Sequence, residues 1–281
     1  MSRLRIVHRT GFSYAEPATA SYNEARMSPY SQDEQFVLSS SLEIHPTATQ
    51  HSYLDYWGTR VSTFEVLTPH RELSVTATSV VEVRPIPRSI GDIEWDTLDV
   101  VRESATIFVE QARQTRATDP DEDVVALARD IRSRGGSVAE VALEVCRTIG
   151  EAMQYMPGST GVHTTSREAW AEKRGVCQDI AHVSIGALRA IGIPARYVSG
   201  YLHPRPSAAI GETVTGESHA WVEWFSGDWR GYDPTNQQEI GENHVLVARG
   251  RDYSDVSPLR GVYAGQSGST LFVTVEITRE A

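Results

Sequence analysis

The sequence lacks the features typical of secreted, membrane and nucleic-acid-binding proteins. It has only two cysteines, Cys146 and Cys177. They are too few for a disulfide framework, so we expect the protein to be located in a reducing cytoplasm. No uninterrupted apolar run approaches the length of a membrane span. The first residues alternate polar and apolar side chains without the apolar centre of a signal peptide, and we expect them to form a strand.

Positive charge is also scarce. Lys and Arg number 26 against 37 Asp and Glu, which gives a net charge of −11, and no long basic run is present. We therefore expect neither nucleic acid nor a membrane as a partner. No His/Cys cluster has zinc spacing and no calcium-loop pattern occurs, so we expect no metal and no cofactor.

The 281 residues are enough for one large domain or two ordinary ones. Short alternating runs separated by turn residues over residues 1–84 predict an N-terminal β-sandwich or barrel. Residues 85–95 contain Pro85 and Pro87 and are expected to be a linker. Residues 96–281 mix helical and alternating patterns, so the predicted fold class is α+β, with a last strand near residues 269–278 in this second domain.

Cys177 follows Arg-Gly-Val and opens an apolar run that is expected to be a helix to about Ile191. The helix is apolar on nearly every side, so it should be central and buried. A thiol at a helix N-terminus meets unpaired amides and the helix dipole, which favour the thiolate. The alternative is a small hydrophobe that caps a core helix. Cys146 lies mid-helix beside an apolar face, where a packed structural thiol is expected.

A nucleophilic cysteine needs a base, and the base needs a group that orients it. The segments SHAWVEWF and DWRGYDPT predict two strands joined by a hairpin at residues 226–228. In that register Phe225 faces Trp229, and His219 and Asp233 become diagonal neighbours on one face, with Cβ atoms within about 7–8 Å. A strand-edge histidine and an ordinary Asp-Pro turn are the alternatives. The joint placement of the three residues favours the catalytic interpretation.

Other candidates fit ordinary structural roles better. His182 lies five residues after Cys177 and therefore off its face of the helix, so we expect a packed or hydrogen-bonded histidine. Asp179 suits a helix start. His203 lies at the edge of a Pro/Gly-rich loop expected over residues 203–217.

Four motifs resemble the core of the bacterial transglutaminase-like family in their order along the chain. They are RGVCQDIAH, GIPARYVSGYL, SHAWVEWF and GYDPTN, within residues 154–236. The N-terminal β-region resembles the domain that often precedes this core. The resemblance implies a papain-like fold, in which a central helix that carries the cysteine packs on an antiparallel sheet. It also implies a Cys-His-Asp triad of Cys177, His219 and Asp233.

The resemblance implies a cysteine-dependent amide-bond hydrolase that acts on a peptide or protein amide. The family also contains protein cross-linkers, so acyl transfer to an amine is the first alternative. A non-catalytic interaction module is the second. An aromatic residue upstream of the cysteine donates to the oxyanion in some relatives. Tyr155 is the candidate for that role here, with a packed core tyrosine as the other interpretation.

Overall fold

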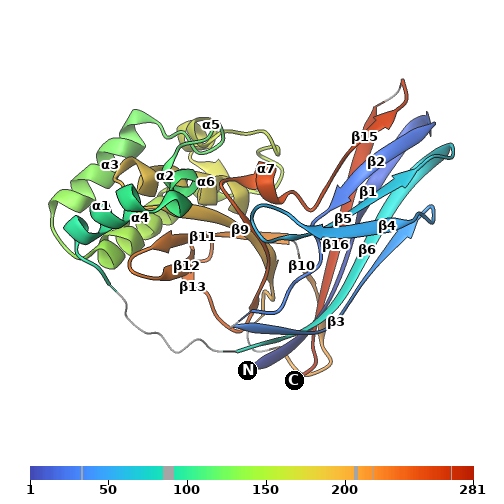
Figure 1. Cartoon of the computed structure of the whole chain (residues 1–281), viewed down its shortest axis with the longest axis horizontal. Coiled ribbons are helices and arrows are strands. Elements are labelled where there is room, and N and C mark those ends of the chain that lie inside the picture. The colour runs from blue at the N-terminus through green and yellow to red at the C-terminus, as the bar shows by residue number, and fades with distance from the viewer. Residues whose placement is uncertain (33, 85–91, 206–207, 217, 267) are drawn as a thin grey trace.

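The computed structural model describes the chain except for residues 33, 85–91, 206–207, 217 and 267. Figure 1 shows the helices gathered on one side and long strands on the other. The two termini lie together at the foot of the strands, where the Arg3 backbone N–H donates to the Ala281 carbonyl at 2.9 Å. Most of the predicted linker lies outside the described residues.

The N-terminal part is a sandwich of two antiparallel sheets. One sheet has the order β10-β16-β1-β6-β3, and the other has the order β15-β2-β5-β4. An apolar cluster that includes Tyr14, Met27, Phe64 and Leu73 lies between them. The strands are β1 (Ser2–Ala18), β2 (Ala20–Ala25), β3 (Gln35–His45), β4 (Gln50–Leu54), β5 (Arg60–Val66), β6 (His70–Val83), β10 (Thr213–Gly216), β15 (Leu259–Ala264) and β16 (Ser269–Arg279). The predicted sandwich is thus observed.

Three strands from the second half of the chain belong to these N-terminal sheets. The prediction placed the last strand in the domain of residues 96–281, but β16 pairs along β1 from Arg279 to Ser269. The predicted loop over residues 203–217 contains β10, which pairs with β16. Both departures have one physical reason. A strand edge offers unpaired N–H and C=O groups to any segment of matching length, however distant in the sequence.

The second part is a helical layer on an antiparallel sheet of order β13-β12-β11-β9-β14. Its strands are β9 (Ala195–Leu202), β11 (Ser218–Phe225), β12 (Trp229–Asp233), β13 (Gln238–Glu239) and β14 (His244–Gly250), with β7 (Gln154–Tyr155) and β8 (Arg174–Gly175) forming a separate parallel pair. The helical segments are α1 (Trp95–Ser104), η1 (Thr106–Phe108), α2 (Val109–Ala112), α3 (Glu122–Ser133), α4 (Val138–Ala152), α5 (Ser166–Glu172), α6 (Cys177–Ala190) and α7 (Tyr253–Val256). Among the described residues, no helix is both long and apolar enough to cross a membrane.

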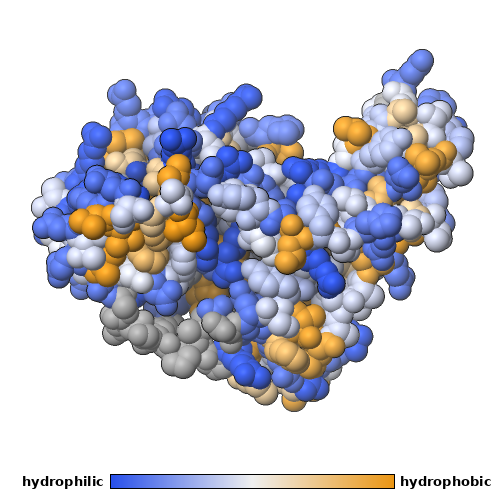
Figure 2. Space-filling view, in the orientation of Figure 1, coloured by the Kyte–Doolittle hydropathy of each residue, from blue (hydrophilic) through white to orange (hydrophobic). Residues whose placement is uncertain are grey.

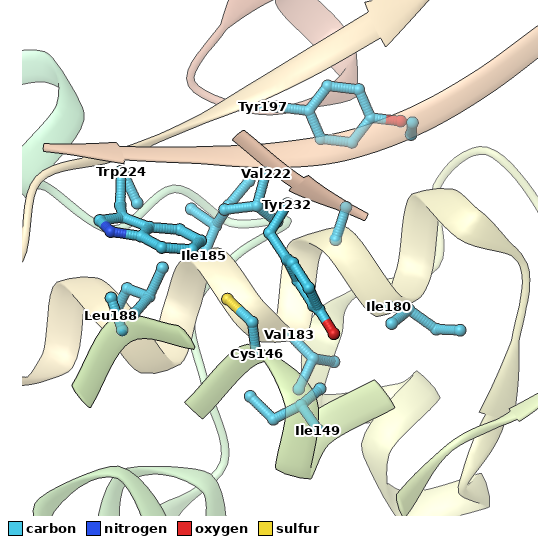
Figure 3. Close-up of a cluster of buried hydrophobic side chains, with 14 of the residues drawn as sticks. Cys146, Ile149, Ile180, Val183, Ile185, Leu188, Tyr197, Val222, Trp224 and Tyr232 are labelled. Carbon is cyan, nitrogen blue, oxygen red and sulfur yellow. The ribbon is translucent and has the colours of Figure 1, made fainter. Parts of the chain in front are cut away.

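Helix α6 is the centre of this part, as its composition predicts. All residues from Gln178 to Arg189 are buried, with α3, α4 and α5 on one side and β9 and β11 on the other. Figure 3 shows Ile185 and Leu188 of α6 between Trp224 of the sheet and the neighbouring helix, with Cys146 inside the same cluster. The helix ends before Gly192, whose φ of 89° matches the left-handed geometry of a helix end.

Buried polar groups join the two parts. Glu223 of β11 accepts hydrogen bonds from Arg196 at 2.6 Å and Arg249 at 2.8 Å, and Arg249 in turn reaches Tyr30 of the N-terminal part at 2.9 Å. Burial, the largest effect, raises the pKa of Glu223, but the two guanidinium groups outweigh it and bring the pKa to about 2. The carboxylate therefore stays ionised at the junction throughout the neutral range.

We predict that Gly186→Ala destabilises the protein although it improves helix propensity. Alanine is favoured over glycine inside a helix by about 1 kcal/mol. A Cβ at Gly186, however, would lie 2.1 Å from the Thr118 carbonyl oxygen. We expect urea denaturation to show a free energy of unfolding lower by about 1–3 kcal/mol.

The matched control is Gly161→Ala, because no atom lies within 4 Å of a Cβ built there. It should change stability by less than about 0.5 kcal/mol. If Gly186→Ala is as stable as the wild type, α6 does not approach the Thr118 carbonyl as closely as the structure shows.

Candidate active site

Cys177 is the first residue of α6 and is partly exposed, as predicted for a residue at the edge of a buried helix. The Asp179 side chain stabilises the first turn of α6. Its Oδ2 accepts from the Val176 backbone N–H at 2.7 Å and from Thr160 Oγ1 at 2.6 Å. Gly175 is needed for space, since a Cβ there would lie 2.6 Å from the Asp179 Cβ. The start of α6 is thus rigid where the thiol emerges.

The hairpin that carries His219 and Asp233 has the predicted register. Phe225 pairs with Trp229 and Val222 with Tyr232. The two candidate side chains meet, with His219 Nε2 at 2.7 Å from Asp233 Oδ2. The structure therefore brings together the residues that the register argument placed on one face.

Asp233 is fully buried and holds its charge through many donors. Its Oδ1 accepts from the backbone N–H groups of Thr235 and Asn236 at 3.0 and 3.1 Å, and its Oδ2 accepts from Asn236 Nδ2 at 2.8 Å. Burial is the largest effect and by itself raises the pKa of Asp233. The hydrogen bonds, with His219 first, more than reverse it and hold the pKa well below its usual range.

His219 contacts both of the other candidates. Burial, again the largest effect, lowers its pKa, but the hydrogen bonds to Asp233 and to the Cys177 side chain raise the pKa to about 10. Because Nε2 faces Asp233, Nδ1 is the ring nitrogen left for the thiol. The arrangement favours an imidazolium that lies between the Cys177 side chain and the Asp233 carboxylate.

Tyr155 lies beside the turn that leads to Cys177. It belongs to β7, and it pairs with Gly175 of β8, two residues before the cysteine. Tyr155 is 43% exposed, so the interpretation as a packed core tyrosine is wrong. Its role as an oxyanion donor stays a prediction.

The remaining sequence candidates occupy structural positions. His182 is buried, and its Nε2 accepts from the Tyr253 backbone N–H at 3.1 Å, which is the hydrogen-bonded helix histidine that was expected. Cys146 is fully buried in the core, where burial raises the pKa of its thiol. His203 is buried at the end of β9, and its Nδ1 accepts from the Arg205 backbone N–H at 3.2 Å.

Two residues of the site had not been predicted. Asn236 holds Asp233, and its position in the GYDPTN motif was the available signal. His244 lies in β14, with its Nε2 at 3.6 Å from Asp233 Oδ2. The run HVLVA that begins at His244 is typical of a short buried strand, but this pattern does not reveal which buried carboxylate its first side chain will meet.

The described residues also form an open groove of about 930 Å³ on the outer side of β2, β5 and β15. None of the candidate residues lines it. Figure 2 shows that the face of the molecule in this view is mainly hydrophilic, with separate hydrophobic patches on the helical side and on the strands. All residues that line the groove belong to the N-terminal sandwich, so the groove is separate from the candidate site.

Comparisons with known proteins agree with this architecture. The family model described as the bacterial transglutaminase-like N-terminal region matches residues 4–82, and that of the transglutaminase-like superfamily matches residues 111–234. An uncharacterized protein of Mycobacterium leprae is 44% identical over 283 residues, which cover 100% of both chains. A protein-glutamine gamma-glutamyltransferase of Pseudomonas aeruginosa is 31% identical over 151 residues, which cover 48% of this chain and 22% of that protein.

A solved structure shares the fold. It is a Cytophaga hutchinsonii protein described as a candidate cysteine protease, with a TM-score of 0.78 and 21% sequence identity. The match covers 99% of this chain and 90% of that chain. The similarity extends over both the β-sandwich and the helical part, so the two form one shared architecture.

We predict that iodoacetamide alkylates Cys177 much faster than Cys146 in the folded protein. Cys177 is partly exposed at a helix start beside His219, whereas Cys146 is enclosed. Peptide mapping by mass spectrometry measures both rates, and Cys177→Ser should abolish the fast reaction. Equal rates for the two thiols in folded protein would remove the basis for a nucleophilic Cys177.

We predict that Asp233→Asn lowers the pKa of His219. The carboxylate favours the charged imidazolium, so replacing it with a neutral amide should lower that pKa by more than about one unit. Titration of the imidazole followed by ¹⁵N NMR measures the change. Asp228→Asn, the same substitution at the exposed turn of the same hairpin, should leave the pKa unchanged. An equal pKa in Asp233→Asn and wild type would show that Asp233 does not stabilise the imidazolium.

Proposed function

The chain belongs to the bacterial transglutaminase-like family, and from that premise we propose that it is a cysteine-dependent amide-bond hydrolase. The observation that carries the proposal is the convergence of the Cys177 thiol, the His219 ring and the buried Asp233 carboxylate, with 2.7 Å between His219 Nε2 and Asp233 Oδ2. As the substrate we propose a peptide or protein amide. As the location we propose the cytoplasm, where a free thiol stays reduced.

The first half of the reaction forms a thioester. The Cys177 thiolate attacks the amide carbonyl carbon, and the carbonyl electron pair moves to oxygen as the S–C bond forms. The oxyanion then collapses and the C–N bond breaks, while the His219 imidazolium gives its proton to the leaving amine. Asp233 keeps the ring in place and stabilises its charged form before the transfer.

The second half regenerates the Cys177 thiolate and the His219 imidazolium. Water attacks the thioester carbonyl while the now neutral His219 accepts its proton, and the C–S bond breaks to release a carboxylic acid. The backbone N–H of Cys177 at the start of α6 supplies one oxyanion donor. We propose the Tyr155 hydroxyl as the second, because β7 holds this exposed side chain next to Gly175.

Acyl transfer is the second candidate. It differs only in that a primary amine, rather than water, attacks the same thioester. The similarity to a protein-glutamine gamma-glutamyltransferase favours it. Water is far more concentrated than any amine, so a transferase must bind its acceptor in an oriented site that excludes water. The partly exposed thiol favours hydrolysis. A purely non-catalytic module is disfavoured because it would have no need of the three converging side chains.

We predict that hydrolysis exceeds aminolysis. The protein should be incubated with a peptide library that contains side-chain and main-chain amides, with and without a primary amine at modest concentration. Mass spectrometry then separates free acids from amine adducts, and Cys177→Ala provides the inactive control. We expect free acids to predominate in both samples, because water has open access to the thioester. Predominance of the amine adduct would reject the hydrolase and leave the transferase.

A further inference from the structure

Asp233 lies between two imidazole rings. His219 is one of them, and His244 of β14 is the other, with its Nε2 at 3.6 Å from the same Oδ2 atom. His244 is only 5% exposed. The mechanism described above uses the first ring and leaves the second unexplained.

The hydrogen-bond network assigns the tautomer of His244. Its Nδ1 lies 3.3 Å from the Gly241 backbone nitrogen, whose N–H donates to it. A nitrogen that accepts cannot carry a proton, so the proton of the neutral ring is on Nε2. Nε2 is buried and makes no hydrogen bond to the described residues. The acceptor that it faces is Asp233 Oδ2, at a distance where an N–H dipole still stabilises a buried carboxylate.

A glycine in the strand between β14 and β11 leaves the space in which Trp221 packs against His244. β9 lies between β14 and β11, and the β9 residue paired with His219 is Gly200. A Cβ at Gly200 would lie 2.6 Å from the Trp221 ring. Trp221 packs edge-on against His244, with 5.4 Å between ring centroids. The missing side chain therefore lets Trp221 occupy the space beside His244 and fix the ring.

β14 is itself fixed by the N-terminal part. The Gln35 side-chain amide accepts from the Leu246 backbone N–H and donates to the Leu246 carbonyl, both at 2.9 Å. This two-point contact lies two residues from His244, next to the register shift in β14 between Leu246 and Ala248. The position of the second imidazole thus depends on contacts from both parts of the molecule.

We propose that His244 is a positioning residue that keeps Asp233 ionised and oriented while His219 changes charge during the reaction. The proposal rests on the function proposed above. When His219 gives its proton to the leaving amine, the buried carboxylate loses its counter-charge, and such a group is costly unless other donors remain. The Nε2–H of His244 does not take part in the proton transfer and remains directed at Oδ2.

The charged and titratable surroundings of the carboxylate are few among the described residues. His219 faces it from β11 and His244 from β14, while Asn236 and Gln238 supply neutral amides. Cys177 of α6 faces His219, and Tyr232 precedes Asp233 in β12. The two imidazole rings also lie near each other, with 6.4 Å between centroids, so the test needs a variant that keeps the donor at this position without the ring.

The test compares His244→Leu with His244→Gln. Leucine removes the donor, whereas glutamine carries an amide N–H at about the depth of the imidazole Nε2. In His244→Leu we expect the His219 pKa, followed by ¹⁵N NMR, to rise by about one unit, because the carboxylate is then less well stabilised when His219 is neutral, and we expect the alkaline limb of the Cys177 alkylation profile to shift upward with it. His244→Gln should restore both. His203→Leu removes another buried histidine, whose ring accepts from the Arg205 backbone N–H, and should change neither.

Three results would overturn the proposal. The first is an unchanged His219 titration in folded His244→Leu. The second is failure of His244→Gln to bring a raised His219 pKa back to the wild-type value, and the third is an equal effect of His203→Leu. If His244→Leu does not fold, the ¹⁵N spectrum of the wild type decides, because a proton on Nδ1 of His244 contradicts the assignment and one on Nε2 supports it. These measurements need no substrate, so absence of amide hydrolysis would reject the proposed function and leave this inference standing.

Discussion

The burial of α6 is the constraint on which the site depends. Every residue from Gln178 to Arg189 is buried between the other helices and the sheet, so the helix can neither slide nor rotate without the loss of close packing. Cys177 is the point at which this buried helix meets solvent. The thiol is therefore held at a defined place relative to β11 and β12, which pack on or beside the same helix.

The same burial requires that polar groups be matched inside the molecule. Arg189 of α6 is 5% exposed and donates to the carbonyl groups of Gln111, Ala195 and Arg251. Its burial lowers the pKa of the guanidinium to about 10, which leaves it charged at neutral pH. Glu223 and Asp233 are also buried, and each carboxylate accepts hydrogen bonds from several donors. A buried charge is tolerated only when such partners are present, so these residues specify one arrangement of strands and helices.

The two parts of the molecule are mechanically connected at the site. β11, which carries His219, follows β10, and β10 is the edge strand of the N-terminal sheet. β14, which carries His244, is held by Gln35 from the same N-terminal part. A displacement of the β-sandwich would therefore reach the histidines from two directions. This gives the N-terminal part a structural role in the site, in addition to any role of its groove.

Much of the local structure follows from the sequence by itself. The apolar run after Cys177 determined a buried helix with the thiol at its edge, because a helix that is apolar all round has no face to give to water. The three residues between Phe225 and Trp229 determined the register of the hairpin, and with it the approach of His219 to Asp233, since side chains alternate strictly along paired strands. The sandwich of the N-terminal part followed from its alternating runs.

The tertiary structure alone decided which distant segments share a sheet and which side chains meet across it. No local pattern shows that β16 pairs with β1, because strand pairing depends on free edges and lengths that arise only when the chain is folded. Likewise nothing near His244 in the sequence indicates Asp233. Their approach depends on the strand order β12-β11-β9-β14 and on the missing side chain at Gly200. Sequence thus determined the position of the candidate nucleophile at the start of its helix and the register of the hairpin, whereas the long-range order of strands decided what surrounds the buried carboxylate.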